Sequence, residues 1–175
     1  KQAAFECPRE IRKQYSVSEG EELEQSTYLS YNIAMDSNLN PKHYLAFQIL
    51  DYVLCSAPGA KVKQALLDAG IGKDVMGSYD NGIYQPIFSI IAKNANAEQK
   101  EAFVTLIEDT LGKLVKDGID KKALEAGIHY HEFRYREADF GNFPTGLEYG
   151  LQMFDRWLYD ESKPFLHLEA LATYE

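Results

Sequence analysis

The sequence predicts an α+β fold in which an antiparallel or mixed sheet carries helices packed on one face. Residues 27–35 alternate apolar and polar side chains, which is typical of a half-buried strand. Asn81-Gly82 separates two further strand-like segments, and Asn-Gly is a strong hairpin signal because both residues tolerate positive φ. From Asn96 onward the apolar residues recur at helical spacing. Short turns between strands favour antiparallel pairing, and the long helical part must cover one face of the sheet.

The first half of the chain is predicted as two strands followed by two helices. Glu10–Val17 is polar with scattered β-formers, which favours an edge strand that Lys and Arg protect from aggregation. Gln25–Met35 is the half-buried strand. Asn40-Pro41 supplies an N-cap and a proline at the first helical position, so a helix should run to about Cys55. A shorter helix, Ala60–Ala69, follows the Pro58-Gly59 break.

The second half is predicted as a hairpin followed by four helices. The hairpin strands are Lys73–Tyr79 and Tyr84–Lys93. Capping-box patterns at Asn96-x-x-Gln99 and Thr145-x-x-Glu148 open the first and third helices. The predicted helices end at about Gly118, Ala138 and Leu158, with Asp120 capping the second, and a short last helix covers Phe165–Tyr174.

The length and the net charge of the chain limit the domain organisation and the functions that it can have. We expect residues 1–175 to form a single domain and residues 1–9 to be an irregular leader. The net charge of -9 argues against a nucleic-acid partner, because phosphate binding needs a basic face. No run of about 18 apolar residues is present, so we expect no membrane-spanning segment. The start of the chain has neither Met nor a signal core, which suggests a domain cut from a longer polypeptide, although processing or removal of a tag would leave the same start.

The two cysteines indicate whether the compartment of the protein is reducing or oxidising. Cys7 and Cys55 lie far apart without CxxC spacing, which favours a reducing setting, either the cytoplasm or an organelle matrix, over a single disulfide. Cys55 stands at a predicted helix end, where packing is the more common role than nucleophilic chemistry.

The segment with the strongest catalytic signal is His129-Tyr130-His131-Glu132-Phe133. An inverted zinc motif requires His-x-x-Glu-His, and Phe133 stands at its last position. His129 and His131 are two residues apart, about 200° of helical rotation, so their rings should point to opposite sides. We therefore interpret His131 as a core-edge residue with one hydrogen bond and His129 as a surface residue. The alternative is a zinc hydrolase that uses His129, Glu132 and an outside ligand such as His167.

Aromatic side chains supply a different kind of candidate site. The sequence has 12 tyrosines and 9 phenylalanines, most of which should be core. Tyr79, Tyr84 and Phe88 lie around the predicted hairpin and could line a peptide-binding wall, since strand edges with aromatic walls suit extended peptides.

Several motifs carry a resemblance to a known family. They are Pro58-Gly59-Ala60-Lys61-Val62 before Ala65-Leu66-Leu67-x-x-Gly70-Ile71-Gly72, then Gln85-Pro86-Ile87-Phe88-Ser89-Ile90, and finally Glu132-Phe133-Arg134-x-Arg136-Glu137 leading to Gly141-x-Phe143-Pro144-x-Gly146-Leu147. From about Tyr28 onward the chain resembles the second domain of the presequence-protease branch of the pitrilysin/insulinase-type zinc metallopeptidases. The resemblance implies an α+β domain of the LuxS/MPP-like type.

The resemblance also implies a division of labour. In that family the first domain holds zinc through His-x-x-Glu-His and a distal glutamate, and the last domain supplies an Arg and a Tyr that grip the substrate. The corresponding first helix here reads His43-x-x-Ala46-Phe47, and the hairpin around Asp80-Asn81-Gly82 has no arginine. We therefore expect no catalytic residue, no metal ligand and no cofactor in this chain, with zinc in the missing catalytic domain.

The favoured interpretation is a non-catalytic domain that supports the catalytic one and walls the peptide chamber of a zinc metalloendopeptidase. Its partners would be the remaining domains of the parent and the peptide substrate. The alternative is a stand-alone peptide-binding or assembly module of the same fold. The motif residues Arg136, Glu137, Gly141, Phe143, Pro144 and Gly146 are assigned structural roles. We expect Phe143 to be buried between the helices on either side, with Pro144 fixing the start of the capping box at Thr145.

Overall fold

The computed structural model describes residues 7–20, 23–137, 141–166 and 168–170. Its helices and strands follow the predicted order for most of the chain. They are β1 (Thr27–Ala34), α1 (Pro41–Asp51), the π-helix η1 (Tyr52–Ser56), α2 (Lys61–Asp68), β2 (Asp74–Asp80), β3 (Ile87–Ala95), the 3₁₀-helix η2 (Ala97–Gln99), α3 (Lys100–Asp117), α4 (Lys121–Glu137), α5 (Thr145–Trp157) and the 3₁₀-helix η3 (Leu168–Ala170). The predicted α+β class is confirmed.

The described part of the chain forms a three-stranded sheet in the order β1-β3-β2. Both neighbouring pairs are antiparallel, so the predicted antiparallel sheet is confirmed. β3 lies at the centre, and its Ile90 stands opposite Tyr31 of β1 and Gly77 of β2. Side chains alternate between the two faces of a strand, and Phe88, Ile90 and Ala92 of β3 are buried on one of them.

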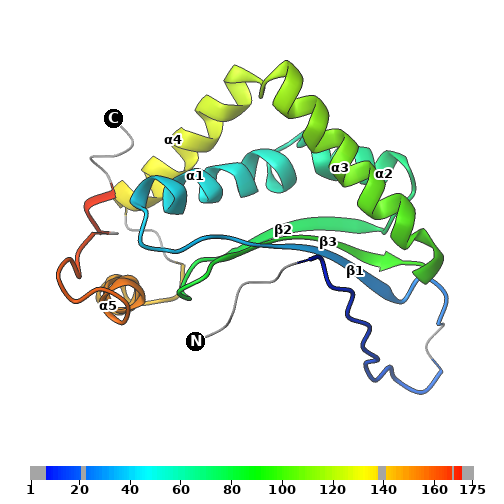
Figure 1. Ribbon diagram of the computed structural model, residues 1–175, viewed down its shortest axis with the longest axis horizontal. Helices are drawn as coiled ribbons and strands as arrows, with labels where there is room; N and C mark the ends of the chain where they lie inside the picture. Colours follow the sequence, from blue (N-terminus) through cyan, green and yellow to red (C-terminus); the bar gives the residue numbers. More distant parts are fainter. Residues whose placement is uncertain (1–6, 21–22, 138–140, 167, 171–175) are drawn as a thin grey trace.

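The helices lie on one face of the sheet (Figure 1). α1 and α2 run over the strands, while α3 and α4 form an arch above them that meets near Gly118. α5 lies beyond the end of the sheet, beside the turn between β2 and β3. The core is therefore a two-layer structure of sheet and helices, and α5 stands outside it.

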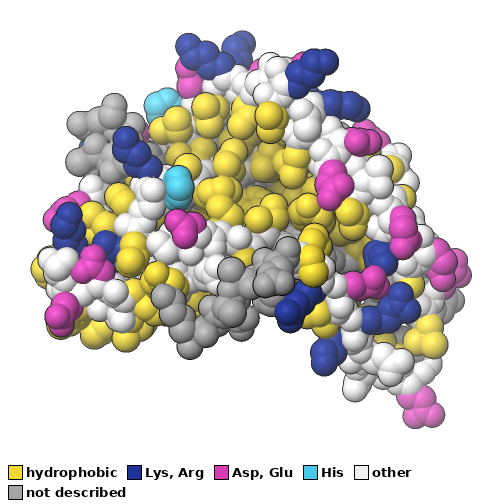
Figure 2. Space-filling model, viewed as in Figure 1, with side chains coloured by type: hydrophobic (Ala, Val, Ile, Leu, Met, Phe, Trp, Pro, Cys, Tyr) yellow, Lys and Arg dark blue, Asp and Glu magenta, His cyan; other side chains and the backbone are white. Residues whose placement is uncertain are grey.

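The core lies between β3 and the helices that cover it. Its largest fully buried side chains include Leu66 of α2, Ile90 of β3, and Phe103 and Ile107 of α3. Hydrophobic side chains also gather on an open face of the molecule between α3 and α4, and again over α5 (Figure 2). The apolar surface of this chain therefore extends beyond its own core.

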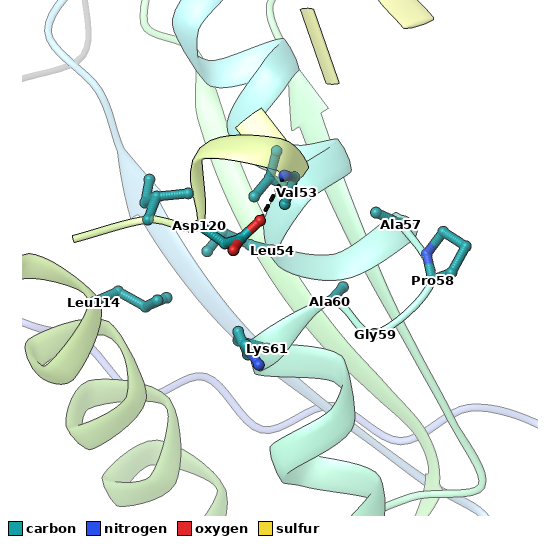
Figure 3. Close-up of a pocket in the computed structure, with 11 residues that line it drawn as sticks. Val53, Leu54, Ala57, Pro58, Gly59, Ala60, Lys61, Leu114 and Asp120 are labelled. Carbon is teal, nitrogen blue, oxygen red and sulfur yellow. Dashed lines mark hydrogen bonds between the residues drawn. The ribbon is translucent and has the colours of Figure 1, made fainter. Parts of the chain in front are cut away.

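Side-chain caps fix where the helices begin. Asn40 Oδ1 accepts hydrogen bonds from the Lys42 and His43 amides at 3.0 and 3.3 Å, and both partners of the Asn96–Gln99 capping box are present. The Asp120 carboxylate accepts from the Ala123 amide at 2.8 Å (Figure 3). These three predicted caps are confirmed, and each satisfies amides that have no partner inside the helix.

The first helix does not continue regularly to Cys55. α1 ends at Asp51 and the chain passes into the π-helical turn η1, where the Ala57 amide donates to the Tyr52 carbonyl at 2.7 Å. The wider turn buries three consecutive side chains, Val53, Leu54 and Cys55. A regular helix would turn one of three consecutive residues away from the core.

The predicted strand at Glu10–Val17 is wrong. These residues form no strand and are exposed, although contacts tie them to the rest of the chain. The Tyr15 hydroxyl donates to the Ser26 carbonyl, and the Tyr15 ring meets Tyr28 edge-on with centroids 5.6 Å apart. Lys100 Nζ lies 2.9 Å from a Glu10 carboxylate oxygen. Side chains, not backbone pairing, therefore hold this segment.

Two predictions around α5 are also wrong. Thr145 is the first residue of the helix and Pro144 its N-cap, without a side-chain cap. The Pro144 carbonyl accepts from the amides of Leu147 and Glu148 instead. Phe143 is 64% exposed, not buried between helices, because α5 does not pack back over it. Of the predicted last helix, Leu168–Ala170 form a 3₁₀ turn, and residues 167 and 171–174 lie outside the described residues.

Candidate functional site

A polar pocket of about 280 Å³ lies between α1, α4, α5 and the end of β2. Its walls come from segments that are far apart in the sequence. The lining residues are Tyr44, Gln48, Asp51, Tyr79, Asn81, His131, Arg134, Tyr135, Glu148, Gln152 and Asp155. The pocket is therefore formed jointly by α1, α4, α5 and the end of β2, and no one of these elements forms it alone.

Asp51 and Gly77 meet where α1 crosses β2. A side-chain carbon at Gly77 would lie 1.9 Å from Asp51 Oδ1, so only glycine leaves room for this carboxylate against the strand. Asp51 Oδ1 is buried and has no hydrogen-bond partner. Burial raises the pKa of the Asp51 carboxyl above its ordinary value, because a low-dielectric setting disfavours the charged form. The sequence thus places a carboxylate with an unpaired oxygen at the wall of the pocket.

The α5 side of the pocket is acidic. Burial raises the pKa of Asp155, and the neighbouring carboxylates of Glu148 and Asp80 raise it further. Gln152 is 9% exposed; its amide nitrogen donates to Glu148 Oε1 at 3.4 Å, and its Oε1 has no partner. Acceptor oxygens therefore outnumber the donors that meet them here.

The α4 side is formed by His131, Arg134 and Tyr135. His131 Nε2 lies 3.0 Å from the Gln48 carbonyl oxygen. Burial lowers the pKa of His131, and nearby Arg134 lowers it further, while the hydrogen bond to Gln48 acts in the opposite direction. Burial likewise raises the pKa of Tyr135 and, well above its usual range, that of Tyr44. Both tyrosines are protonated walls of the pocket at neutral pH.

The histidine pair of α4 points in two directions, as the helix geometry predicts. His131 faces α1, whereas the His129 side chain is 76% exposed, with Nδ1 3.7 Å from Glu132 Oε2. Glu132 also pairs with Arg136 at 2.7 Å. In the ranges that the structure describes, no group of three or more His, Cys, Asp or Glu side chains could hold a metal ion. His167, the third ligand of the alternative zinc site, lies outside the described residues.

The resemblance implies that the family's zinc motif corresponds to the start of α1. His43 and Phe47 are four residues apart, and their rings meet edge-on with centroids 6.5 Å apart. Phe47 also contacts Tyr79 and Phe88, at 5.7 and 5.9 Å between centroids. At the positions that the resemblance assigns to the second histidine ligand and the glutamate base stand Phe47, a partly buried ring packed against the core, and Ala46.

The three aromatic residues predicted as a peptide wall are not equivalent. Phe88 is 4% exposed and belongs to the core, with its ring 6.4 Å from that of Tyr79. Tyr79 lines the polar pocket, and burial raises its pKa to about 12. Tyr84 is 37% exposed and packs against Tyr159 at 5.4 Å. A wall role is available to Tyr79 and Tyr84, while Phe88 supports Tyr79 from behind.

The remaining motif residues flank the break between α4 and α5. Arg136 and Glu137 are exposed at the end of α4, where Arg136 pairs with Glu132. Gly141 has a φ of 62°, a left-handed conformation that favours glycine. Pro144 and Gly146 are exposed at the start of α5. Their structural roles in the motif stay a prediction.

The second cavity is a packing feature. It measures about 40 Å³ and lies between η1, α2 and the start of α4, with Pro58, Gly59 and Ala60 on its wall (Figure 3). Asp120, which also lines it, is already engaged as the cap of α4. Cys55, nearby in η1, is buried and free, and burial raises its pKa to about 12, so its thiol is protonated and unreactive.

The three-stranded antiparallel sheet with helices on one face is a fold that solved relatives share. Residues 2–130 match the family described as Peptidase M16 inactive domain, and the chain belongs to this family. It is similar to Protein HypA of Clostridium perfringens, with 42% identity over 168 residues, and to Presequence protease 1, chloroplastic/mitochondrial, of Arabidopsis thaliana, with 31% identity over 176 residues. These alignments cover 96% and 98% of this chain but 17% and 16% of the two relatives.

Solved structures agree with the fold. The inactive peptidase domain of a Bordetella parapertussis protein has a TM-score of 0.67 at 11% identity, with 85% of this chain and 79% of that chain covered. The Peptidase M16 inactive domain from Pseudomonas fluorescens has a TM-score of 0.55 at 16% identity, with 82% and 34% covered. The family match and the relatives confirm the predicted resemblance to a non-catalytic domain of the zinc metallopeptidase family. No helix among the described residues is long and apolar enough to cross a membrane.

Proposed function

We propose that this chain is a supporting domain of a larger zinc metalloendopeptidase and carries none of its bond-cleaving chemistry. The observation that carries the proposal is the start of α1. There Ala46 and Phe47 replace the base and the second ligand that the family's zinc motif requires, and Phe47 is packed among Tyr79 and Phe88. A zinc-bound water needs three protein ligands and an open position. The zinc of the parent would be held in another domain.

The surface of α5 supports contact with the other domains of the parent. Leu147, Leu151 and Phe154 lie on one helical face and are 50%, 51% and 49% exposed. Trp157 stacks on Phe154 with ring centroids 5.8 Å apart and is 45% exposed. We call these four side chains the α5 stripe. The chain spans about a sixth of the length of its relatives, so the remaining polypeptide is the natural occupant of this surface.

A wall of the peptide chamber is the second part of the proposal. Tyr84 and Tyr79 lie beside the turn that joins β2 to β3, and Tyr84 offers an exposed ring. Aromatic rings beside a strand end suit an extended peptide. Cys7 and Cys55 are both free, which supports a reducing compartment, either the cytoplasm or an organelle matrix.

Zinc content of the purified chain tests the proposal first. The protein is prepared without chelators and without a His-tag, and its metal is measured by mass spectrometry beside its peptidase activity. We expect zinc far below one equivalent and no cleavage of an unstructured peptide. Zinc near one equivalent that is lost in His43→Ala or His129→Ala, together with cleavage, would contradict the supporting role. Lys13→Ala, at an exposed position of the segment before β1 and outside both histidine-bearing helices, is the matched control.

A further inference from the structure

We propose that the polar pocket between α1, α4 and α5 binds one organic cation, the guanidinium or ammonium end of an arginine- or lysine-like molecule. This inference goes beyond the supporting role and does not depend on it. The same head group could come from a free small molecule or from a side chain of a polypeptide.

The charges of the pocket select a cation. Three carboxylates line it, those of Asp51, Glu148 and Asp155. None of the salt bridges among the described residues involves any of these three carboxylates. Arg134 and His131 are the basic groups of the lining, and Arg134 lies over the Tyr130 ring, 5.9 Å from its centroid. Three acidic side chains against two basic ones make the lining acidic, so it favours a cation over an anion.

Unpaired acceptors indicate where the cation would donate. Gln152 is nine-tenths buried, lines the pocket and leaves its Oε1 without a partner. Asp51 Oδ1 is the second unpaired acceptor, held against Gly77. A buried acceptor without a donor carries a cost that a bound donor relieves. A guanidinium presents five N–H donors and can serve several acceptors at once.

The shape of the pocket favours an organic cation over a metal ion. Within the described ranges, no group of three acidic, His or Cys side chains could hold a metal ion. The volume of about 280 Å³ is far larger than one ion requires. Tyr44, Tyr79 and Tyr135 supply aromatic walls on which an aliphatic stem and a cationic head can pack.

The test titrates the purified chain with N-acetyl-arginine amide, followed by heteronuclear NMR and calorimetry. We expect saturable binding, with shifts at the amides around Asp51, Gly77 and Gln152. The citrulline analogue, which is isosteric but neutral, should bind at least about tenfold more weakly. Equal binding of the two analogues, shifts spread over the acidic surface, or no binding would each overturn the proposal. So would displacement of the probe by Mg²⁺, with shifts at the same residues.

Variants assign the binding to the three carboxylates. Asp155→Asn and Asp51→Asn keep the side-chain shape and should each weaken arginine binding by about tenfold or more. Glu148→Gln serves the same purpose if either of these fails to fold. Glu125→Gln is the matched control, because it makes the same change of charge at an exposed position of α4. An equal loss in Glu125→Gln would show non-specific attraction and contradict the site.

A second titration, with a short peptide, distinguishes the two possible sources of the cationic head group. The probe is acetyl-Ala-Arg-Ala-amide, compared with its citrulline counterpart. Binding of the peptide at least as tight as that of the free derivative indicates a polypeptide side chain as the ligand. Binding of the free derivative alone indicates a small-molecule cation. Both results support the cation site, and failure of both probes overturns it.

Discussion

Helices α3 and α5 carry the same apolar spacing and use it in opposite ways. On α3, Phe103 and Ile107 are 1% and 0% exposed, because the helix covers α2 and β1. On α5, Leu151 and Phe154 are about half exposed, and the helix stands beyond the end of the sheet (Figure 1). Helical periodicity therefore identifies an apolar face but does not say what covers it. On α3 the cover is this domain, and on α5 we propose that it is another domain of the parent.

The largest expected effect is the loss of stability when a buried ring of α3 is removed. Phe103→Ala removes a fully buried ring and should lower the free energy of unfolding by about 3–5 kcal/mol. Phe154→Ala removes the same ring from the α5 stripe and should cost less than about 1 kcal/mol. Denaturant melts of the two variants measure the difference. Equal losses would show that α5 is packed against its own domain in solution.

A glycine in each region gives the second contrast. Gly77→Ala would place a carbon 1.9 Å from Asp51 Oδ1 and should destabilise the chain by about 1–3 kcal/mol. Gly150→Ala, on α5, has no atom within 4 Å of the added carbon and should be neutral or stabilising by up to about 1 kcal/mol. Combining Gly77→Ala with Asp51→Ala should cost less than the sum of the two single changes. Strict additivity in thermal melts would mean that the contact with Asp51 does not constrain Gly77.

Two ring stacks give a smaller contrast. Tyr130 of α4 stacks on Tyr52 of η1, with ring centroids 4.6 Å apart and ring planes at 15°. This contact joins α4 to η1. A double-mutant cycle with leucine at both positions should give a coupling of about 0.5–1.5 kcal/mol. Phe154 and Trp157 stack within α5 alone, so their cycle should give about 0.2–0.5 kcal/mol. A coupling energy between Phe154 and Trp157 that is larger than the one between Tyr52 and Tyr130 would contradict this prediction.

The smallest expected effect is a pH dependence from His131. Burial holds the pKa of His131 below its ordinary value in the folded chain, so the unfolded chain binds the proton more readily. The contribution to stability is therefore complete above the ordinary pKa and is lost as pH falls through the folded value. Melting temperatures between about pH 7.5 and pH 5.5 should fall more steeply in the wild type than in His131→Gln. His129→Gln, at an exposed ring, should keep the steep fall; identical slopes in all three proteins would exclude the contribution of His131.

Local signals predicted most of the fold. The Asn40, Asn96 and Asp120 caps depend on residues within three positions of one another, and all three are confirmed. The strand at Glu10–Val17 failed because its pattern does not say whether a partner edge is free, and in the structure side-chain contacts replace pairing. The prediction that Phe143 is buried failed because, as on α5, apolar spacing does not show whether another element covers the side chain. Spacing predicts the apolar face, and tertiary contacts decide its burial.

The polar pocket was not predicted, because its walls come from four elements. Asp51 and Asp155 are about a hundred residues apart, and no local motif joins them. Two local anomalies point to it in hindsight. Gly77 stands in the interior of a strand, where glycine is unfavourable without a close neighbour, and Asp51 interrupts an otherwise apolar end of α1. By contrast, the orientation of His129 and His131 follows from helical rotation alone and was predicted correctly.

The π-helical turn at Tyr52–Ser56 sets the length that this part of the chain must have. It holds one residue more than an α-helical turn would, and the bond from the Ala57 amide to the Tyr52 carbonyl closes that wider ring. Removing one residue here would close a regular α-helical turn in its place. Val53, Leu54 and Cys55 could then not all stay buried, because a regular helix turns one of three consecutive side chains away from the core. This turn should therefore reject deletions that the exposed loop at Pro58-Gly59 accepts.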